Sequence, residues 1–420
     1  MKTTASTSLL LLSALAFSQV VVIAQSGRPD GRPDTRPRAQ RGMAPPRPVA
    51  PPQPGRLRFG DPLAGLTAAQ LATFAQGRAE FENRESPEGG LGPIFNNSSC
   101  VACHASGATG GGGPVTVTRF GRNTPQGFDP LTELGGPLLQ MTATDFSGQE
   151  IVPFNADVVA HRQSTPLFGL GLIEAIPDAT IISNAQRLAS DGVRGKFSAV
   201  LDPVSNQPRV GRFGWKAQQA TLLAFSADAY LNEMGVTSRI FPTENAPNGN
   251  ADLLAALDHV ADPEDTVDPA TGKSDIDASA DFMQLLAPPP PLPLTAGAAA
   301  GSRIFHQSGC AVCHLPSMTT GLNPIAALSL KPVPLYSDLL LHDMGELGDG
   351  IPDGTAGPRD MRTPPLWGLR ASAPYLHDGR AATVDAAIKA HDGEARNARD
   401  RYLRLRAMEQ RQLAEFLNSL

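Results

Sequence analysis

The chain has 420 residues, of which 41% are hydrophobic and 18% charged, so it is long enough for two or three domains and is not a single small module. Its 41 Gly and 39 Pro predict a loop-rich globular protein. A net charge of −6 gives no reason to expect nucleic acid as a partner.

The first 24 residues have the layout of a secretory signal peptide. Lys2 precedes an apolar stretch at 9–16, and small or apolar residues at 22–24 form a cleavage pattern. An uncleaved membrane anchor is the alternative, but Ser18 and Gln19 interrupt the run before it reaches the ~20 residues that a span needs. We expect a periplasmic or otherwise exported protein with no transmembrane span in the mature chain.

Residues 25–60 form a Pro/Arg-rich linker. The segment contains nine prolines, eight arginines and only two acidic residues, so it cannot build a hydrophobic core. An extended, semi-rigid spacer is the simplest interpretation. The alternative is an Arg-rich arm that docks on an anionic surface.

Apolar periodicity predicts helices at 67–81, with Thr67 as N-cap, at 218–234, and at 400–420 as a packed closing helix. Residues 115–118 are at best a short strand. The prolines at 288–291 break the chain near the start of its last third.

All four cysteines lie in two C-x-x-C-H motifs, Cys100-Val101-Ala102-Cys103-His104 and Cys310-Ala311-Val312-Cys313-His314. This is the attachment sequence of c-type haem, in which both thiols bind the haem and the following His is the proximal iron ligand. A Cys₄ zinc site and a redox-active dithiol are the alternatives, but neither requires a His after the second Cys. The motifs predict two covalent haems, with His104 and His314 as iron ligands and no cysteine left for a disulfide.

An internal repeat supports two haem units. Ile94 and Phe95 precede the first motif with the spacing by which Ile304 and Phe305 precede the second. Related segments also follow each motif, RQSTPLFGL and RTPPLWGL. The repeat predicts a mainly α fold with two cytochrome c-like haem domains in tandem and long loops. We expect the domains at 61–245 and 291–420, joined by an interdomain segment at 246–290.

These segments resemble the di-haem oxidoreductase/putative peroxidase family, and more distantly the bacterial di-haem cytochrome c peroxidases and the di-haem enzyme that matures tryptophan tryptophylquinone. The resemblance covers roughly 60–420. The first half lacks a counterpart of His377-Asp378-Gly379-Arg380. The segments that carry the resemblance are GLGPIFNNSSCVACH, STPLFGLGLIEAIP, GRFGWKA, YSDLLLHDMG, RTPPLWGL and YLHDGRAATVDAAIKAHDGEA.

The resemblance also implies axial ligands. His391 lies eight residues beyond Thr383, where the peroxidases take a Met ligand for their electron-transferring haem, so it is the candidate sixth ligand of the second haem. Met344 is the alternative ligand, and His391 as a surface residue is the other alternative. We expect His342 to bond a propionate or a backbone group. The first haem has no equally good sixth ligand, and His161 is only a weak candidate.

The related peroxidases place a glutamate on the distal side of their first haem as acid and base. Glu174 lies in the apolar run 170–176, so we expect it to take that part, and we take Glu174 and Arg162 as candidate catalytic residues. The alternative is a structural salt bridge from Glu174 to Arg162 or Arg212.

A tryptophan lies between the haems in the related enzymes, where it can relay electrons. Trp215 is the preferred candidate and Trp367 the other, although large aromatic residues are usually core. Calcium is a further candidate cofactor by the same resemblance. Asp349 and Asp353 resemble a calcium loop only weakly, and the sequence assigns no ligand.

The sequence therefore predicts an exported, peroxidase-like di-haem oxidoreductase, in which one haem transfers electrons and the other activates peroxide. A small redox donor protein or a quinol-linked cytochrome is the expected partner, and peroxide the candidate substrate. Two alternatives remain: an electron-transfer cytochrome without substrate chemistry, and an enzyme that oxidises a partner protein.

Overall fold

The computed structural model describes residues 49, 51–52, 57–187 and 191–420, all within one compact unit, Asp34–Leu420. The predicted signal peptide and most of the predicted linker lie outside the described residues. Within the described part, no helix is long and apolar enough to cross a membrane.

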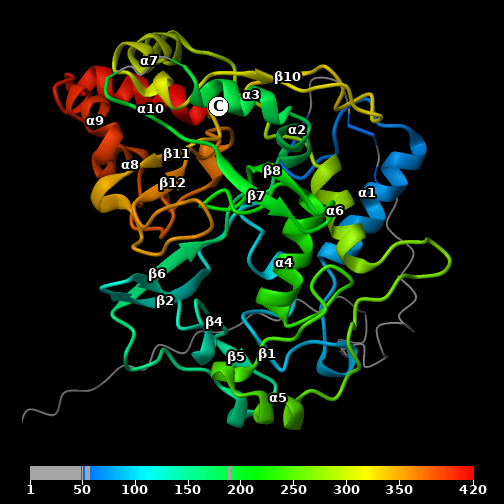
Figure 1. Cartoon of the computed structure of the whole chain (residues 1–420). Helices are drawn as coiled ribbons and strands as arrows, with labels where there is room; N and C mark the ends of the chain where they lie inside the picture. Colours follow the sequence, from blue (N-terminus) through cyan, green and yellow to red (C-terminus); the bar gives the residue numbers. More distant parts are fainter. Residues whose placement is uncertain (1–48, 50, 53–56, 188–190) are drawn as a thin grey trace, which may run out of the picture. The chain divides into compact units, whose positions relative to one another are not determined.

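The expectation of a mainly α fold is wrong. The described residues are 34% helix, with 3₁₀ turns included, and 16% strand, a mixed α/β composition (Figure 1). The described residues form α1 (Ala68–Phe81), α2 (Leu170–Glu174), α3 (Asp178–Ala185), α4 (Leu222–Met234), α5 (Ala251–Leu257), α6 (Asp275–Leu285), α7 (Ala296–Gln307), α8 (Val384–Ala390), α9 (Arg396–Leu403) and α10 (Ala407–Ser419).

The strands are short and antiparallel, and most pair as two-stranded ribbons. They are β1 (Ile94–Phe95), β2 (Thr116–Thr124), β3 (Gly127–Asp129), β4 (Leu138–Leu139), β5 (Thr142–Ala143), β6 (Val158–Gln163), β7 (Ser198–Asp202), β8 (Gln207–Gly211), β9 (Met318–Thr319), β10 (Pro332–Val333), β11 (Leu341–Asp343) and β12 (Asp360–Arg362).

Strand β2 shows why the predicted mainly α fold class is wrong. The sequence suggested a strand over 115–118 at most, but β2 continues to Thr124 and pairs with β3, β4 and β6. Thr118 and Phe120 are buried on one face, the two-residue period of a half-buried strand. Segments that the sequence predicts as loops therefore form backbone hydrogen bonds by pairing with one another as strands.

Each of the three predicted helical ranges contains a helix, but the helix ends differ from the predicted ones. Helix α1 begins after Thr67, whose side chain forms a capping box with Gln70. Helix α4 begins at Leu222 rather than at 218, because the Thr221 side chain caps it. The predicted closing helix is two helices, since Arg406 is extended and caps α10 (φ −66°, ψ 152°).

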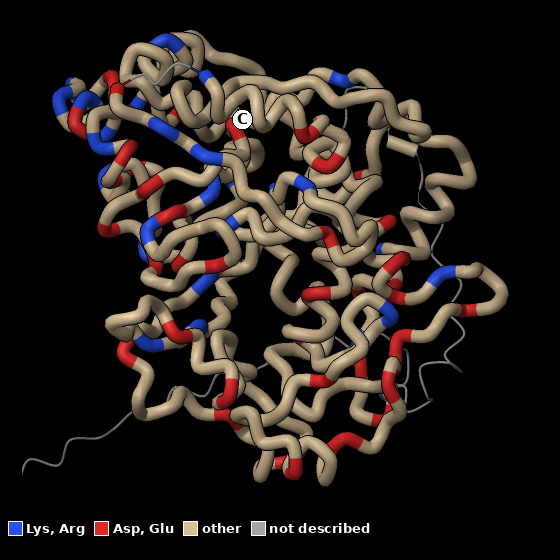
Figure 2. Tube along the Cα trace, in the orientation of Figure 1, with Lys and Arg blue, Asp and Glu red and all other residues tan. Residues whose placement is uncertain are grey.

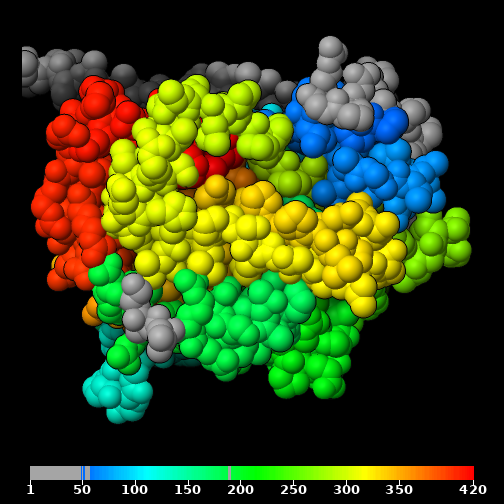
Figure 3. Space-filling view, turned by 90° about the horizontal axis from the view of Figure 1, so that it is seen from above, coloured from blue at the N-terminus to red at the C-terminus, as the bar shows by residue number. Residues whose placement is uncertain are grey.

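The largest hydrophobic cluster contains side chains from both halves of the chain, including Phe74, Phe282, Leu340 and Trp367. Helix α6, in the predicted interdomain segment, packs on α1 and α4. Helix α7 packs on α10, and the two lie directly together in the space-filling view (Figure 3). Because the core runs across the predicted boundaries, the division into two haem domains stays a prediction.

Candidate functional site

Both C-x-x-C-H motifs fold as a single 3₁₀ turn, Cys100–Ala102 and Cys310–Val312. In each motif the His N–H donates to the carbonyl of the first Cys, at 3.0 Å for His104 and for His314. One turn thus carries two thiols and an imidazole, and no disulfide joins the cysteines. Smaller hydrophobic clusters flank the turns, with Cys100 packed against one and Cys310 against another.

The two motif histidines have the same tautomer. Nδ1 of His104 lies 3.1 Å from the Gly111 carbonyl, and Nδ1 of His314 lies 3.0 Å from the Tyr336 carbonyl. Because a carbonyl only accepts, Nδ1 carries the hydrogen in both rings. This leaves the Nε2 lone pair of His314 available to a metal, whereas the His104 ring also has a backbone hydrogen bond with Thr165. Burial lowers the pKa of His104 to about 4, and burial followed by the charge of His391 lowers that of His314 to about 4. Both imidazoles are neutral, as iron ligands must be.

A largely apolar cavity of about 260 Å³ lies beside the second motif. Cys310, Cys313, His314 and His391 all line it, and Met344 does as well. Nδ1 of His391 lies 2.8 Å from the Ala387 carbonyl, so its Nε2 is also available to a metal. The structure therefore brings His391 to the second motif, and its role as sixth ligand stays a prediction.

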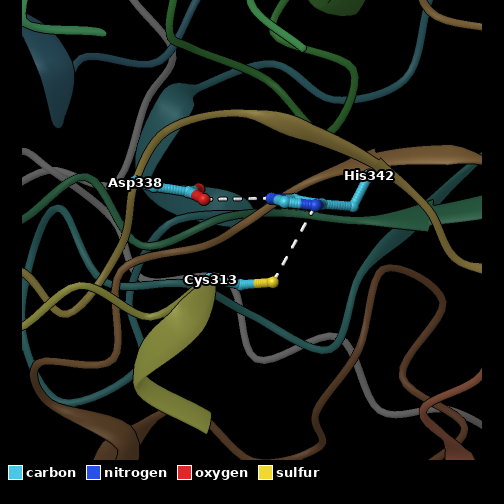
Figure 4. A group of neighbouring side chains, drawn as sticks. All are labelled: Cys313, Asp338 and His342. Carbon is cyan, nitrogen blue, oxygen red and sulfur yellow. Dashed lines mark hydrogen bonds and ion pairs between the residues drawn. The ribbon is translucent and has the colours of Figure 1, made fainter. Parts of the chain in front are cut away.

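His342 lies beside Cys313 and is held between two carboxylates. Its Nε2 is 3.0 Å from Asp338 Oδ2 and its Nδ1 is 2.8 Å from Glu394 Oε2, with the Cys313 sulfur 3.8 Å from Nδ1 (Figure 4). Burial alone would lower its pKa, but the hydrogen bonds to Asp338, Cys313 and Glu394 raise it to about 12. We expected a propionate or backbone partner, and the described partners are acidic side chains instead.

Trp215 has contacts that lead toward both motifs. It lines the cavity of the second motif, and its Nε1 donates to the Gln163 carbonyl at 2.7 Å. The next residue, Ser164, hydrogen-bonds Cys103 of the first motif. Trp367 lines the same cavity but packs in the main core. The predicted electron-relay role of Trp215 stays a prediction that this position supports.

Glu174 and Arg162, the candidate catalytic residues, are not neighbours. Glu174 Oε1 accepts from the Leu222 N–H at 2.7 Å, at the start of α4, and Oε2 accepts from Gln284 at 3.2 Å. Arg162 is 5% exposed and pairs with Asp349 at 2.8 Å and Asp353 at 3.2 Å. Their catalytic roles stay predictions, although these contacts resemble structural ones.

The other residues that the sequence offers as candidates have the following contacts. Arg212 donates to the Glu174 carbonyl at 3.1 Å and pairs with Asp178 rather than with the Glu174 carboxylate. His161 is exposed on β6 and meets Thr118 at 3.3 Å. The Asp349 carboxylate forms ion pairs with two side chains, because Lys216 contacts it at 2.9 Å in addition to Arg162.

Residues 144–420 match the family "Di-haem oxidoreductase, putative peroxidase". The chain belongs to this family. The match includes the second motif and begins after the first. No protein of curated function matches the chain.

Solved structures similar to this di-haem oxidoreductase are remote. They include hydrazine synthase of Kuenenia stuttgartiensis, at 14% identity and TM-score 0.38 over 98% of this chain and 100% of that chain. A variant of the diheme peroxidase BthA from Burkholderia thailandensis has 14% identity and TM-score 0.37 over 83% and 85%. A MauG-like protein associated with microbial copper homeostasis has 20% identity and TM-score 0.30 over 50% and 69%.

Sequence reasoning missed a group of charged residues near the first motif of the di-haem oxidoreductase. Burial, followed by the charge of Glu233 on α4, raises the pKa of the Cys103 thiol to about 11. Glu233 Oε2 accepts from Asn96 at 2.8 Å. Burial raises the pKa of Glu233, and it raises that of Asp228 to about 6. Arg119 interacts with both carboxylates, and its Nε has no hydrogen-bond partner among the described residues. Asp228 and Glu233 are the two charged residues of α4, but nothing in the local sequence links them to Cys103.

Proposed function

We propose that the chain is an exported, peroxidase-like di-haem oxidoreductase with two covalently attached haems c. Cys100 and Cys103 would hold the first haem, and Cys310 and Cys313 the second, with His104 and His314 as proximal ligands. When bound, haem c supplies an iron that exchanges electrons and, where a coordination position is open, binds peroxide. The donor set fits this cofactor, because each motif places two thiols and a neutral imidazole on one turn.

The observation that carries the proposal is the unequal distribution of histidines. His391 faces the cavity of the second motif together with His314, and His342 lines that cavity too. His377 packs on Trp215, with ring centroids 6.3 Å apart. The remaining histidines, His161, His259 and His306, are exposed. None of these contacts, which cover the histidines in the described part of the chain, pairs a second histidine with His104, so we infer that the second haem transfers electrons and that the first reacts with peroxide.

The residues near the first motif supply proton transfer. Glu233 is a half-buried carboxyl group whose pKa burial raises, which favours its protonated form and makes it a candidate to donate and accept a proton. The sequence assigned this acid–base role to Glu174, whose carboxylate is engaged by the Leu222 N–H and Gln284. We propose Glu233 as the stronger candidate, and matched variants of the two residues separate the assignments.

Trp215 provides the connection between the two centres. Its ring lines one cavity while its N–H is fixed to the segment that contacts the other motif. An aromatic ring at this position can pass an electron or a hole between the centres. The electron source we propose is a small redox donor protein or a quinol-linked cytochrome. Oxidation of a partner protein would use the same relay.

The decisive experiment is the electron paramagnetic resonance spectrum of the purified ferric protein. We expect one low-spin signal from the second haem and one high-spin signal from the first. Addition of peroxide with a reduced donor should then give turnover. Two low-spin signals and no reaction with peroxide would instead identify an electron carrier.

A further inference from the structure

The segment that follows β4, which we call the aromatic loop (141–154), exposes four large apolar side chains. Met141 is 41% exposed, Phe146 92%, Ile151 69% and Phe154 102%. Single exposed apolar residues are common on protein surfaces. Two fully exposed aromatic rings in one short loop are unusual, because each ring would gain free energy on burial. The aromatic loop therefore has the character of an interaction surface.

Hydrogen bonds give the aromatic loop a defined backbone. The Asn248 side chain donates to the Ile151 carbonyl at 2.9 Å and accepts from the Ile151 N–H at 3.1 Å. The buried Glu150 carboxylate accepts from the Asn248 N–H at 2.8 Å. Phe146 lies in a short 3₁₀ turn that the Asp145 side chain caps. The exposed rings therefore belong to a structured loop.

The surroundings of the aromatic loop are acidic. The stretch 123–161 contains five acidic residues and no Lys or Arg. Three of the five are exposed: Glu133, Asp145 and Asp157. Helix α5 contacts the Phe146 turn and adds the exposed Asp252. At the lower end of the molecule, where Figure 1 labels β5 and α5, Figure 2 shows acidic residues but no Lys or Arg among the described residues. A ligand of this surface should be basic and able to pack on aromatic rings.

The Pro/Arg-rich segment of the same chain has this composition. Residues 25–48, which lie outside the described residues, contain six Arg, six Pro and two Asp. Arg-Pro pairs begin at positions 28, 32, 36 and 47. Arginine side chains pair with carboxylates and stack on aromatic rings. Proline-rich segments dock on aromatic surfaces because they lose little conformational entropy on binding.

We propose that residues 25–48 bind the aromatic loop of their own chain. The first described residue, Val49, packs against the main hydrophobic cluster, so the segment starts from the body of the protein. Twenty-four residues of a Pro-rich segment reach about 75 Å, at ~3.1 Å per residue. A unit of about 360 residues has a radius of gyration of only about 20 Å. The aromatic loop is therefore within reach of the segment.

Other ligands fit this surface less well. A second copy of the loop carries the same acidic residues, so a contact between two loops would bring like charges together. An anionic lipid surface would be repelled by the same carboxylates. A basic partner protein has a suitable charge but must bind from solution, whereas a tethered segment has an effective concentration in the millimolar range. An affinity of about 0.1 mM would therefore keep the segment bound about 90% of the time.

The aromatic loop is connected to the first motif. Its strand β5 pairs with β1, which precedes Cys100. The Met141 N–H donates to Asn96 Oδ1 at 3.0 Å, and Asn96 Nδ2 donates to Glu233 at 2.8 Å. A bound segment would therefore lie beside the chain that leads into the first motif. This inference does not depend on the peroxidase assignment, because the contact needs neither haem nor peroxide.

Trypsin digestion of the purified, full-length holoprotein with residues 25–48 intact tests the contact. Trypsin cuts poorly before proline, so Arg38 and Arg41 are the expected cleavage sites in the segment. Cleavage at both sites should be at least about tenfold slower than in a free synthetic peptide of residues 25–48 in the same buffer, because a bound segment is protected. Mass spectrometry measures both rates. Sodium chloride at about 0.5 M should remove most of the protection, since it screens the charges.

Phe146→Ser with Phe154→Ser should bring the cleavage rate close to that of the free peptide. Both side chains are exposed, so the double variant should fold. Leu322→Ser is the matched control, because Leu322 is 87% exposed on a different loop, and it should leave the protection unchanged. Glu133→Gln removes one exposed carboxylate and should speed cleavage by about twofold to threefold.

Three outcomes would overturn the proposal. Cleavage of the wild type as fast as that of the free peptide would mean that the segment is not bound. Equal protection in the wild type and in the double Phe variant would place the contact elsewhere. Protection that grows with protein concentration would mean that the segment binds a second copy rather than its own chain.

Discussion

Carboxylate side chains lie near the turn of the first C-x-x-C-H motif, and imidazole side chains lie near the turn of the second. Near Cys103 lies Glu233, which in turn interacts with Asp228, and burial raises the pKa of both carboxyl groups. Beside Cys313 lie His342 and, in the same cavity, His391. The turns themselves have the same hydrogen bonds and the same His tautomer. Two turns of the same local geometry thus lie in two environments, and we propose that one is suited to proton transfer and the other to a second axial ligand.

The environments also differ in charge. Arg396, Arg399 and Arg401 lie on α9 next to the second centre, and Lys and Arg gather at this upper left part of the charge view (Figure 2). The segment that runs from α5 to α6 is instead rich in acidic residues. An anionic redox partner would be attracted to the second centre, which is where electrons should enter.

The largest expected effect comes from removing one attachment turn at a time. Cys100→Ala with Cys103→Ala should leave one haem per chain and remove the high-spin signal, because the second turn is intact. Cys310→Ala with Cys313→Ala should do the reverse. A pyridine haemochrome assay with electron paramagnetic resonance measures both. Loss of the same signal from either double variant would mean that the two centres are not distinct.

The next effect tests the proton-transfer environment. Glu233→Gln keeps size and hydrogen bonding but removes the base, so the reaction with peroxide should slow by about 10²-fold with haem content unchanged. Glu174→Gln is the matched variant and should change the rate less than tenfold. Stopped-flow absorbance measures both rates. The opposite ranking would return the acid–base role to Glu174.

The two environments are connected by a buried ion network, and Lys216→Met breaks it. Lys216 is fully buried and contacts Asp349 at 2.9 Å, while Arg162 from β6 contacts the same carboxylate. Removal of one partner should destabilise the protein by about 3 kcal/mol. Denaturant unfolding measures this loss, with the exposed Lys331→Met as control.

The same network predicts a pH dependence. Burial would raise the pKa of Asp349, but Arg162 and Lys216 lower it below its usual range. The stabilisation is therefore complete above the ordinary aspartate pKa and is lost as the pH falls through the lowered value. The difference between Lys216→Met and the wild type should narrow below about pH 4. A constant difference at all pH values would exclude the ion pairs as its cause.

The local signals in the sequence were sufficient for the attachment turns and for α1. Cys-x-x-Cys-His spacing fixes a single turn, and Thr67 with Gln70 specifies a cap within four residues. The predicted fold class is wrong because strand pairings such as that of Thr116 with Gln163 join segments that are far apart in sequence. No periodicity within either segment reveals such a partner.

The surroundings of the turns were harder to predict for the same reason. The sequence predicts a functional role for Glu174 because it interrupts an apolar run, but its carboxylate accepts a hydrogen bond from the N-terminus of α4. Glu233 was overlooked because its distance from Cys103 in sequence exceeds any local signal. The family resemblance helped where it mapped a position directly, as for His391, which lies in the cavity of the second motif.

The smallest expected effect distinguishes the ligand of the second centre. His391→Met should raise the reduction potential of the second haem while keeping it low-spin, because a thioether donates less electron density than an imidazole. We expect roughly 60 mV or more, a tenfold change in the one-electron equilibrium. Met344→Leu is the control, since Met344 lines the same cavity and should leave the potential unchanged. Redox titration followed in the visible spectrum measures both. A shift with Met344→Leu and none with His391→Met would make Met344 the ligand, and the second centre would then owe its low spin to sulfur rather than to a second imidazole.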